Sequence, residues 1–208
     1  MKAFGLAFLL LCMLVLPAMA GPVAAPTVEQ IGARVAKPQV LRGQFEQTKT
    51  VKGFRNPLRS TGSFVVARDH GVIWKTEKPF ASELVITADQ IRSRQADGSQ
   101  RVEVDASQQP AMRSFNAVMF SLISGDMTSL AKVFRIEPVA TGTAAWQLRL
   151  TPRSRMLERA FTELQLQGDR HVSHVDIVEA SGDRTRIVFK ALTESPSSLR
   201  AEEASRFE

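Results

Sequence analysis

Cysteine is almost absent from this chain of 208 residues. The one cysteine, Cys12, lies inside an apolar run that extends from Phe4 to Leu16. The residues after this run therefore offer no thiol for a disulfide and no thiolate nucleophile. A lipid-modified terminus would need a cysteine after the run with small residues before it, whereas Leu11 precedes Cys12. We expect a chain without a lipid anchor of its own.

Long apolar segments are also lacking. The run that ends at Leu16 is too short to cross a bilayer comfortably as a resident helix. Lys2 precedes it, and the small residues of positions 17–20 follow it, which is typical of a secretory signal peptide cleaved before Gly21. An uncleaved amphiphilic anchor is the alternative. We expect residues 1–20 to be removed and residues 21–208 to form one exported domain.

Residues that support catalysis are scarce. Of the three histidines, His70 lies in a predicted turn, and His171 and His174 fall on opposite faces of a predicted strand, where they make poor joint metal ligands. The chain has no Gly-x-Ser-x-Gly elbow, no phosphate-binding loop and no dinucleotide fingerprint. These gaps predict no catalytic residue, no metal site and no cofactor, and thus a protein that is not an enzyme.

Tyrosine is missing altogether, and tryptophan occurs only at Trp74 and Trp146, beside twelve phenylalanines. Surfaces that recognise sugars or proteins use the polar edges of Tyr and Trp, so this aromatic set suits an apolar interior instead. The net charge is +6, and the basic residues are scattered along the chain. Since export makes nucleic acid an improbable partner, an acidic membrane leaflet or an acidic protein remains, unless these residues are only a solvated surface.

The first half of the chain changes from one helix to a series of strands. Thr27 and Gln30 form a capping box for a helix that ends before Pro38. Short segments rich in Val, Ile, Phe, Trp and Thr follow, and Asp97-Gly98 suits a hairpin turn between the last two. The predicted strands are residues 41–50, 58–67, 71–78, 83–87, 90–95 and 101–105.

The middle and the second half continue this pattern. Ser114 caps an apolar helix that Gly125 ends, and a short helix is predicted at 127–132; Met112, Met119 and Met127 lie here, as in an adaptable apolar surface or an ordinary core helix. Strands are predicted at 134–138, 145–151, 160–167, 172–179 and 185–191, before a helix at 199–206. Short connections indicate one curved antiparallel sheet, with helices over its concave side.

The order of several short motifs resembles that of LolA-type outer-membrane lipoprotein carriers. The matching segments are LRGQFEQ at 41–47, GSF at 62–64, GVIWKTEKP at 71–79, LVITAD at 84–89 and LRLTP at 148–152. The resemblance implies a mainly β fold with α-helices, an incomplete antiparallel β-barrel with a helical lid over a hydrophobic cavity. The cavity residues that we predict are Phe45, Phe64, Trp74, Leu84, Ile86, Phe115, Met119 and Leu122.

The same resemblance implies a role for Arg68. In the family an arginine ahead of the tryptophan latches the closed lid, and Arg68 occupies the matching position, although Asp69 follows it where the family has proline. Guanidinium donors can satisfy several carbonyls and release them when cargo enters. The alternative is an ordinary surface arginine at the end of a strand.

The resemblance also implies a function and its partners. We expect a soluble periplasmic monomer that binds an acylated protein or a related lipid, receives it from an inner-membrane export complex and delivers it to an outer-membrane receptor, with transient contact with the membrane surface. A periplasmic lipid-sensing module of the same fold is the second hypothesis. An enzyme that acts on lipids is the third, and the missing nucleophile counts against it.

Overall fold

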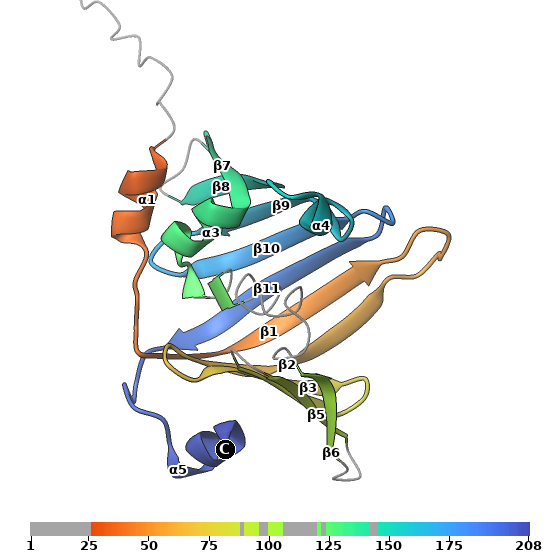
Figure 1. Ribbon diagram of the computed structural model, residues 1–208, viewed down its shortest axis with the longest axis vertical. Helices are drawn as coiled ribbons and strands as arrows, with labels where there is room; N and C mark the ends of the chain where they lie inside the picture. Colours follow the sequence, from red (N-terminus) through yellow and green to blue (C-terminus); the bar gives the residue numbers. More distant parts are fainter. Residues whose placement is uncertain (1–25, 88–89, 96–99, 106–119, 122–123, 142–144) are drawn as a thin grey trace, which may run out of the picture.

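Eleven antiparallel strands form one strongly curved sheet in the computed structural model, which describes residues 26–87, 90–95, 100–105, 120–121, 124–141 and 145–208 (Figure 1). The strand order is β6-β5-β4-β3-β2-β1-β11-β10-β9-β8-β7. Strands β6 and β7 are the two edges, so the sheet does not close. The predicted fold class, an incomplete antiparallel barrel, is confirmed.

The predicted strands are all present, and their ends differ from the predicted ones by at most two residues. The strands are β1 Val40–Thr50, β2 Leu58–Ala67, β3 Gly71–Lys78, β4 Ser82–Ile86, β5 Gln90–Gln95, β6 Gln100–Asp105, β7 Phe134–Val139, β8 Trp146–Pro152, β9 Phe161–Gly168, β10 Val172–Glu179 and β11 Arg184–Thr193. Alternating burial along β2, β8 and β9 explains why a sequence pattern was enough to find these strands.

The helices are short. They are α1 Val28–Arg34, α3 Met127–Val133, α4 Arg155–Glu158 and α5 Ala201–Phe207. The capping box of α1 is confirmed, since the Thr27 hydroxyl accepts a hydrogen bond from the Gln30 N–H and the Gln30 side chain accepts one from the Thr27 N–H. The sequence did not predict α4, a single turn that Ser154 caps. Of the apolar helix predicted from Ser114, only a few residues are described, and Phe120, Ser121 and Ser124 are helical. The predicted turn at Asp97-Gly98 lies outside the described residues.

The inner face of the sheet carries the main core. Strand register places Phe64 opposite Trp74, and Trp74 opposite Leu84, so these side chains share one face. Helices α1 and α3 contact each other and β7 (Figure 1). Ile31 of α1 and Leu130 of α3 are fully buried there. These two short helices are held by packing rather than by helix propensity.

The C-terminal segment covers the outer face of the sheet at β1 and β3. Helix α5 contacts β3, and Figure 1 shows it on the side of the sheet opposite to α1 and α3. Arg42 of β1 points to this side and forms a buried ion pair with Glu203 of α5, with Nη2 2.6 Å from Oε2. Glu203 is therefore buried, at 7% exposure, although it belongs to a short helix of otherwise mostly charged and small residues at the end of the chain.

No helix among the described residues combines the length and the apolar character that a membrane crossing needs. The predicted signal peptide lies outside the described residues.

Candidate functional site

Aromatic side chains from four strands meet on the inner face. The rings of Phe45 and Trp74 stack with centroids 3.8 Å apart. Phe64 lies 6.2 Å from Trp74 and 5.1 Å from Phe189, and Phe189 meets Trp74 edge-on at 6.3 Å. Offset and edge-on ring pairs of this kind stabilise each other beyond their burial. The structure thus brings three predicted cavity residues together, with Phe189 as a fourth member.

Two glycines make room for this aromatic cluster, because aromatic rings pack directly against their backbone. Gly62 lies opposite Phe45 in the register, and a Cβ there would stand 2.9 Å from the Phe45 ring and 1.9 Å from the Lys75 carbonyl oxygen. A Cβ on Gly43 would stand 2.8 Å from the Phe64 ring. The two glycines of the matching motifs therefore leave room for the rings that lie beside them.

The remaining predicted cavity residues divide into two groups. Leu84 and Ile86 lie on the same inner face, half-buried, opposite Trp74 and Val72 of β3. Phe115, Met119 and Leu122 lie outside the described residues, so their place in the cavity remains a prediction. Phe120, from the same predicted helix, is partly buried and packs against the core.

A pocket of about 250 Å³ opens where the inner face meets the start of β1. Leu41 and Val66 form its apolar floor, and Phe120 lines it from the helical segment. The polar part of its lining is Lys37, Arg68, Ser124 and Asp126. Sequence reasoning missed most of these residues, because they come from three separate segments of the chain, 37–41, 66–68 and 120–126.

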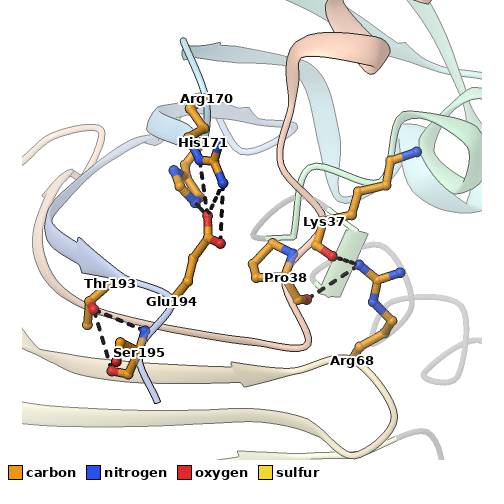
Figure 2. Close-up of polar contacts among 8 residues, drawn as sticks. All are labelled: Lys37, Pro38, Arg68, Arg170, His171, Thr193, Glu194 and Ser195. Carbon is orange, nitrogen blue, oxygen red and sulfur yellow. Dashed lines mark hydrogen bonds and ion pairs between the residues drawn. The ribbon is translucent and has the colours of Figure 1, made fainter. Parts of the chain in front are cut away.

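Arg68 holds the segment between α1 and β1. Its Nη2 donates hydrogen bonds to the carbonyl oxygens of Lys37 and Pro38, the latter at 3.4 Å (Figure 2). Its backbone N–H donates to the carbonyl of Gln39 at 2.9 Å. The described carbonyls that the guanidinium contacts thus belong to the α1–β1 connection, whose residues Lys37 and Pro38 line the pocket together with Arg68. A guanidinium that binds carbonyls in this way suits a releasable contact.

Asp126 and Ser124 line the same pocket as Arg68, but they differ in whether their side-chain oxygens have hydrogen-bond partners. Asp126 caps α3 and accepts a hydrogen bond from the Ser129 N–H at 3.1 Å. Burial raises the pKa of Asp126, but hydrogen bonds from Ser129 and Thr128 outweigh it and hold this pKa below 3.8, so the carboxylate is ionised at neutral pH. The buried Ser124 hydroxyl, in contrast, has no hydrogen-bond partner among the described residues.

The histidines take part in local contacts. His171 precedes β10, and its Nε2 lies 2.9 Å from Oε1 of Glu194, which also binds Arg170 (Figure 2). Nδ1 of His174 lies 2.9 Å from the Ser173 hydroxyl. Within the described part of the chain, no three His, Cys, Asp or Glu side chains are grouped so that they could hold a metal ion.

Phe189 is the inner-face residue that sequence reasoning left out of the cavity. A signal for it was present, because Thr185, Ile187 and Phe189 share one face of the predicted last strand, whose other face carries the charged residues Arg186 and Lys190. All three are buried in the structure. What the pattern could not supply was the neighbour, since β11 pairs with β1, which lies far away in the sequence.

Comparison with known proteins gives a family match over most of the chain. The model of the family described as "Outer membrane lipoprotein carrier protein LolA" matches residues 36–201. An outer-membrane lipoprotein carrier protein from Bordetella avium is 26% identical over 174 residues, which is 84% of this chain and 80% of that protein. One from Ralstonia nicotianae is 29% identical over 187 residues, 83% of this chain and 79% of that protein.

Among solved structures, a LolA superfamily protein from Nitrosomonas europaea is similar with a TM-score of 0.47 at 9% identity. The match covers 87% of this chain and 95% of that chain.

Proposed function

Since this chain belongs to the LolA family of outer-membrane lipoprotein carriers, we propose that it carries the acyl chains of lipoproteins, or of a related lipid, through the periplasm. The carrier receives its cargo from an inner-membrane export complex, delivers it to an outer-membrane receptor and works as a monomer. No covalent chemistry is required, because the cargo only moves between apolar environments.

The observation that carries this proposal is the aromatic cluster of Phe45, Phe64, Trp74 and Phe189 on the inner face, next to a pocket with an apolar floor. The pocket of about 250 Å³ lies just below the range of roughly 300–1,000 Å³ that is usual for small-molecule sites, so acyl chains need an extension of this space. The half-buried Leu84 and Ile86 provide an apolar surface for it on the same face.

Polar groups at the pocket suit the polar end of an acyl chain. An acyl group is joined to its protein or headgroup through an ester or amide, whose carbonyl oxygen needs a donor once it leaves water. The unpartnered Ser124 hydroxyl and the cations Lys37 and Arg68 lie around the pocket and can donate. We assign Arg68 the role of a latch, which holds the α1–β1 connection while the pocket is empty and yields its carbonyls when cargo enters.

Burial supplies enough free energy for such a carrier. Each methylene that leaves water contributes about 0.8 kcal/mol, so one long acyl chain provides strong binding even after the cost of ordering it. Delivery then requires an acceptor that binds the chain more tightly, or a change that loosens the pocket.

Native mass spectrometry of protein purified gently from the periplasm tests the proposal. We expect a discrete added mass that fragments to an acylated protein or an acylated lipid. A bare protein that stays empty after incubation with membranes would contradict carriage and favour the lipid-sensing module.

A further inference from the structure

The strongly exposed large apolar side chains of the described chain all lie at one end of the sheet. They are Phe54 at 71% exposure, Leu58 at 62%, Phe80 at 83% and Met156 at 45%. The connections β1–β2, β3–β4 and β8–β9 hold them or border them. Because neighbouring strands are antiparallel, β1, β3, β8 and β10 all end at this edge. We define the hairpin rim as Leu58 together with the four connections at this edge that the structure describes, residues 51–57, 79–81, 153–160 and 180–183.

The hairpin rim is also basic. Its connections carry five cations, Lys52, Arg55, Arg153, Arg155 and Arg159, against two carboxylates, Glu158 and Asp183. No acidic residue occurs anywhere from Gln47 to Arg68.

The charged side chains of the rim differ in whether they form contacts within the protein. Asp183 accepts a hydrogen bond from the Lys52 N–H at 3.0 Å and lies 3.8 Å from Nζ of Lys49, so its charge is used inside the rim. In the part of the chain that the structure describes, Arg55, Arg155 and Arg159 are exposed and form no ion pair. Their charge is therefore available to an anionic partner.

We propose that the hairpin rim docks onto an anionic lipid bilayer. Phe54, Leu58 and Phe80 enter the interfacial layer, while the free guanidinium groups contact lipid phosphates. Figure 1 shows the β1–β2 connection at the end of two long strands, where it projects beyond the neighbouring turns. Apolar side chains on separate, projecting turns suit a fluid interface, whereas a protein partner of standard size requires a broader complementary surface.

This orientation keeps the pocket away from the membrane. The pocket lies at the start of β1, and the rim lies at its end, roughly 35 Å away for a strand of 11 residues. A carrier docked through its rim would present the pocket mouth to a partner that gives or takes cargo. This last point rests on the proposed function, but docking itself does not require cargo.

Vesicle flotation with the empty mature protein, residues 21–208, tests the proposal separately from carriage, because it lacks the apolar run from Phe4 to Leu16 that could itself bind lipid. We expect flotation with equimolar phosphatidylglycerol and phosphatidylcholine vesicles, weak flotation with phosphatidylcholine alone, and loss of binding at high salt. The double variant Arg55→Glu/Arg155→Glu should bind at least about tenfold more weakly, since one cation near an anionic surface changes binding about fivefold. Phe54→Ser/Phe80→Ser should also weaken binding, and both positions are too exposed to affect folding.

The matched control is Arg170→Glu, which changes the charge by the same amount per site at the opposite end of the sheet, where the side chain is 69% exposed. Its binding should equal that of the wild-type protein. Equal binding to neutral and anionic vesicles, no wild-type binding, or unchanged binding of the rim variants would each overturn the proposal. So would a photo-crosslinker at position 54 that captures a membrane protein instead of lipid.

Discussion

Arg42 forms the most completely buried ion pair of the described chain. Its guanidinium donates to both carboxylate oxygens of Glu203, at 2.7 and 2.6 Å, and to the carbonyls of Pro196 and Ser198 at 2.6 and 2.9 Å. These four bonds fasten the C-terminal segment to the outer face of β1. Breaking a buried pair by removing one partner leaves the other charge unsatisfied, which costs far more than losing a surface pair.

We predict that Arg42→Ala lowers the free energy of unfolding by about 3–5 kcal/mol. Urea denaturation measures this change. The control is Lys190→Ala, which removes the exposed pair with Glu46 and should cost less than about 1 kcal/mol. Equal losses in both variants would mean that Arg42 acts as an ordinary surface residue.

The same pair makes stability depend on acid. Hydrogen bonds from Arg42 hold the pKa of Glu203 below its ordinary value of 4.5. Since the pKa is lower in the folded state, the stabilisation is complete above the unfolded value and is lost as the pH falls through the folded value. We expect the wild-type protein to lose more unfolding free energy between pH 7 and about pH 3 than Glu203→Gln does. Urea midpoints across this range test it, and identical slopes would refute the assignment.

Arg68 offers a functional prediction at the same scale. Arg68→Leu removes the donor to the Lys37 and Pro38 carbonyls while keeping an aliphatic stem. The latch contact forms again as the pocket empties, which is the step that accompanies release of the cargo. We therefore expect the rate of transfer of a bound acylated protein to acceptor membranes to change more than the rate of cargo uptake. Stopped-flow transfer of a fluorescent lipopeptide measures both rates. Normal transfer kinetics would leave Arg68 as a structural surface residue.

At the scale of the element, we expect Gly→Ala substitutions at two glycines to have opposite effects on the free energy of unfolding. In β2, a Cβ on Gly62 would meet the Lys75 carbonyl oxygen at 1.9 Å, and backbone cannot give way as a flexible side chain can. We expect Gly62→Ala to cost about 2–3 kcal/mol of unfolding free energy. Gly32 lies within α1, where a Cβ would meet Met127 at an ordinary 3.9 Å, so Gly32→Ala should be neutral or stabilise by up to about 1 kcal/mol. Chemical denaturation of the pair distinguishes the two outcomes.

The elements also show why sequence reasoning succeeded where it did. Strands β2, β3, β5 and β10 have the predicted bounds, because alternating apolar residues and turn residues are local signals. The single turn of α4 was missed, since four residues carry no detectable helical period. The burial of Glu203 has no local signal either, because an acidic residue in a short terminal helix has the sequence pattern of a surface residue. Its partner Arg42 lies 161 positions away.

At the scale of the whole molecule, the two faces and the two ends of the open sheet carry different features. The inner face carries the aromatic cluster, the outer face binds the C-terminal segment, one end holds the pocket and the other holds the hairpin rim. A ligand that binds only the folded state stabilises it by mass action.

We therefore predict that a lipopeptide raises the midpoint of thermal unfolding. At a ligand concentration of a hundred times its Kd, it adds about 2.7 kcal/mol to the free energy of unfolding. The emission of Trp74 should change as well, because its ring is part of the aromatic cluster, whereas Trp146 is fully buried. The same peptide without its acyl chain is the control. A midpoint that rises equally with both peptides would contradict an acyl-chain site.

The sequence by itself determined the strands, the cap of α1, the antiparallel topology with short connections and a set of inner-face residues, because each depends on neighbours within a few positions. The predicted cavity residues Phe45, Phe64 and Trp74 came from the resemblance to LolA-type carriers, whose motifs contain all three. Only the tertiary structure decided that Phe189 joins them, that Arg42 binds Glu203, and that the exposed apolar side chains gather at one end. Those features depend on which strands pair and in which register, and pairing between distant segments leaves no local signal.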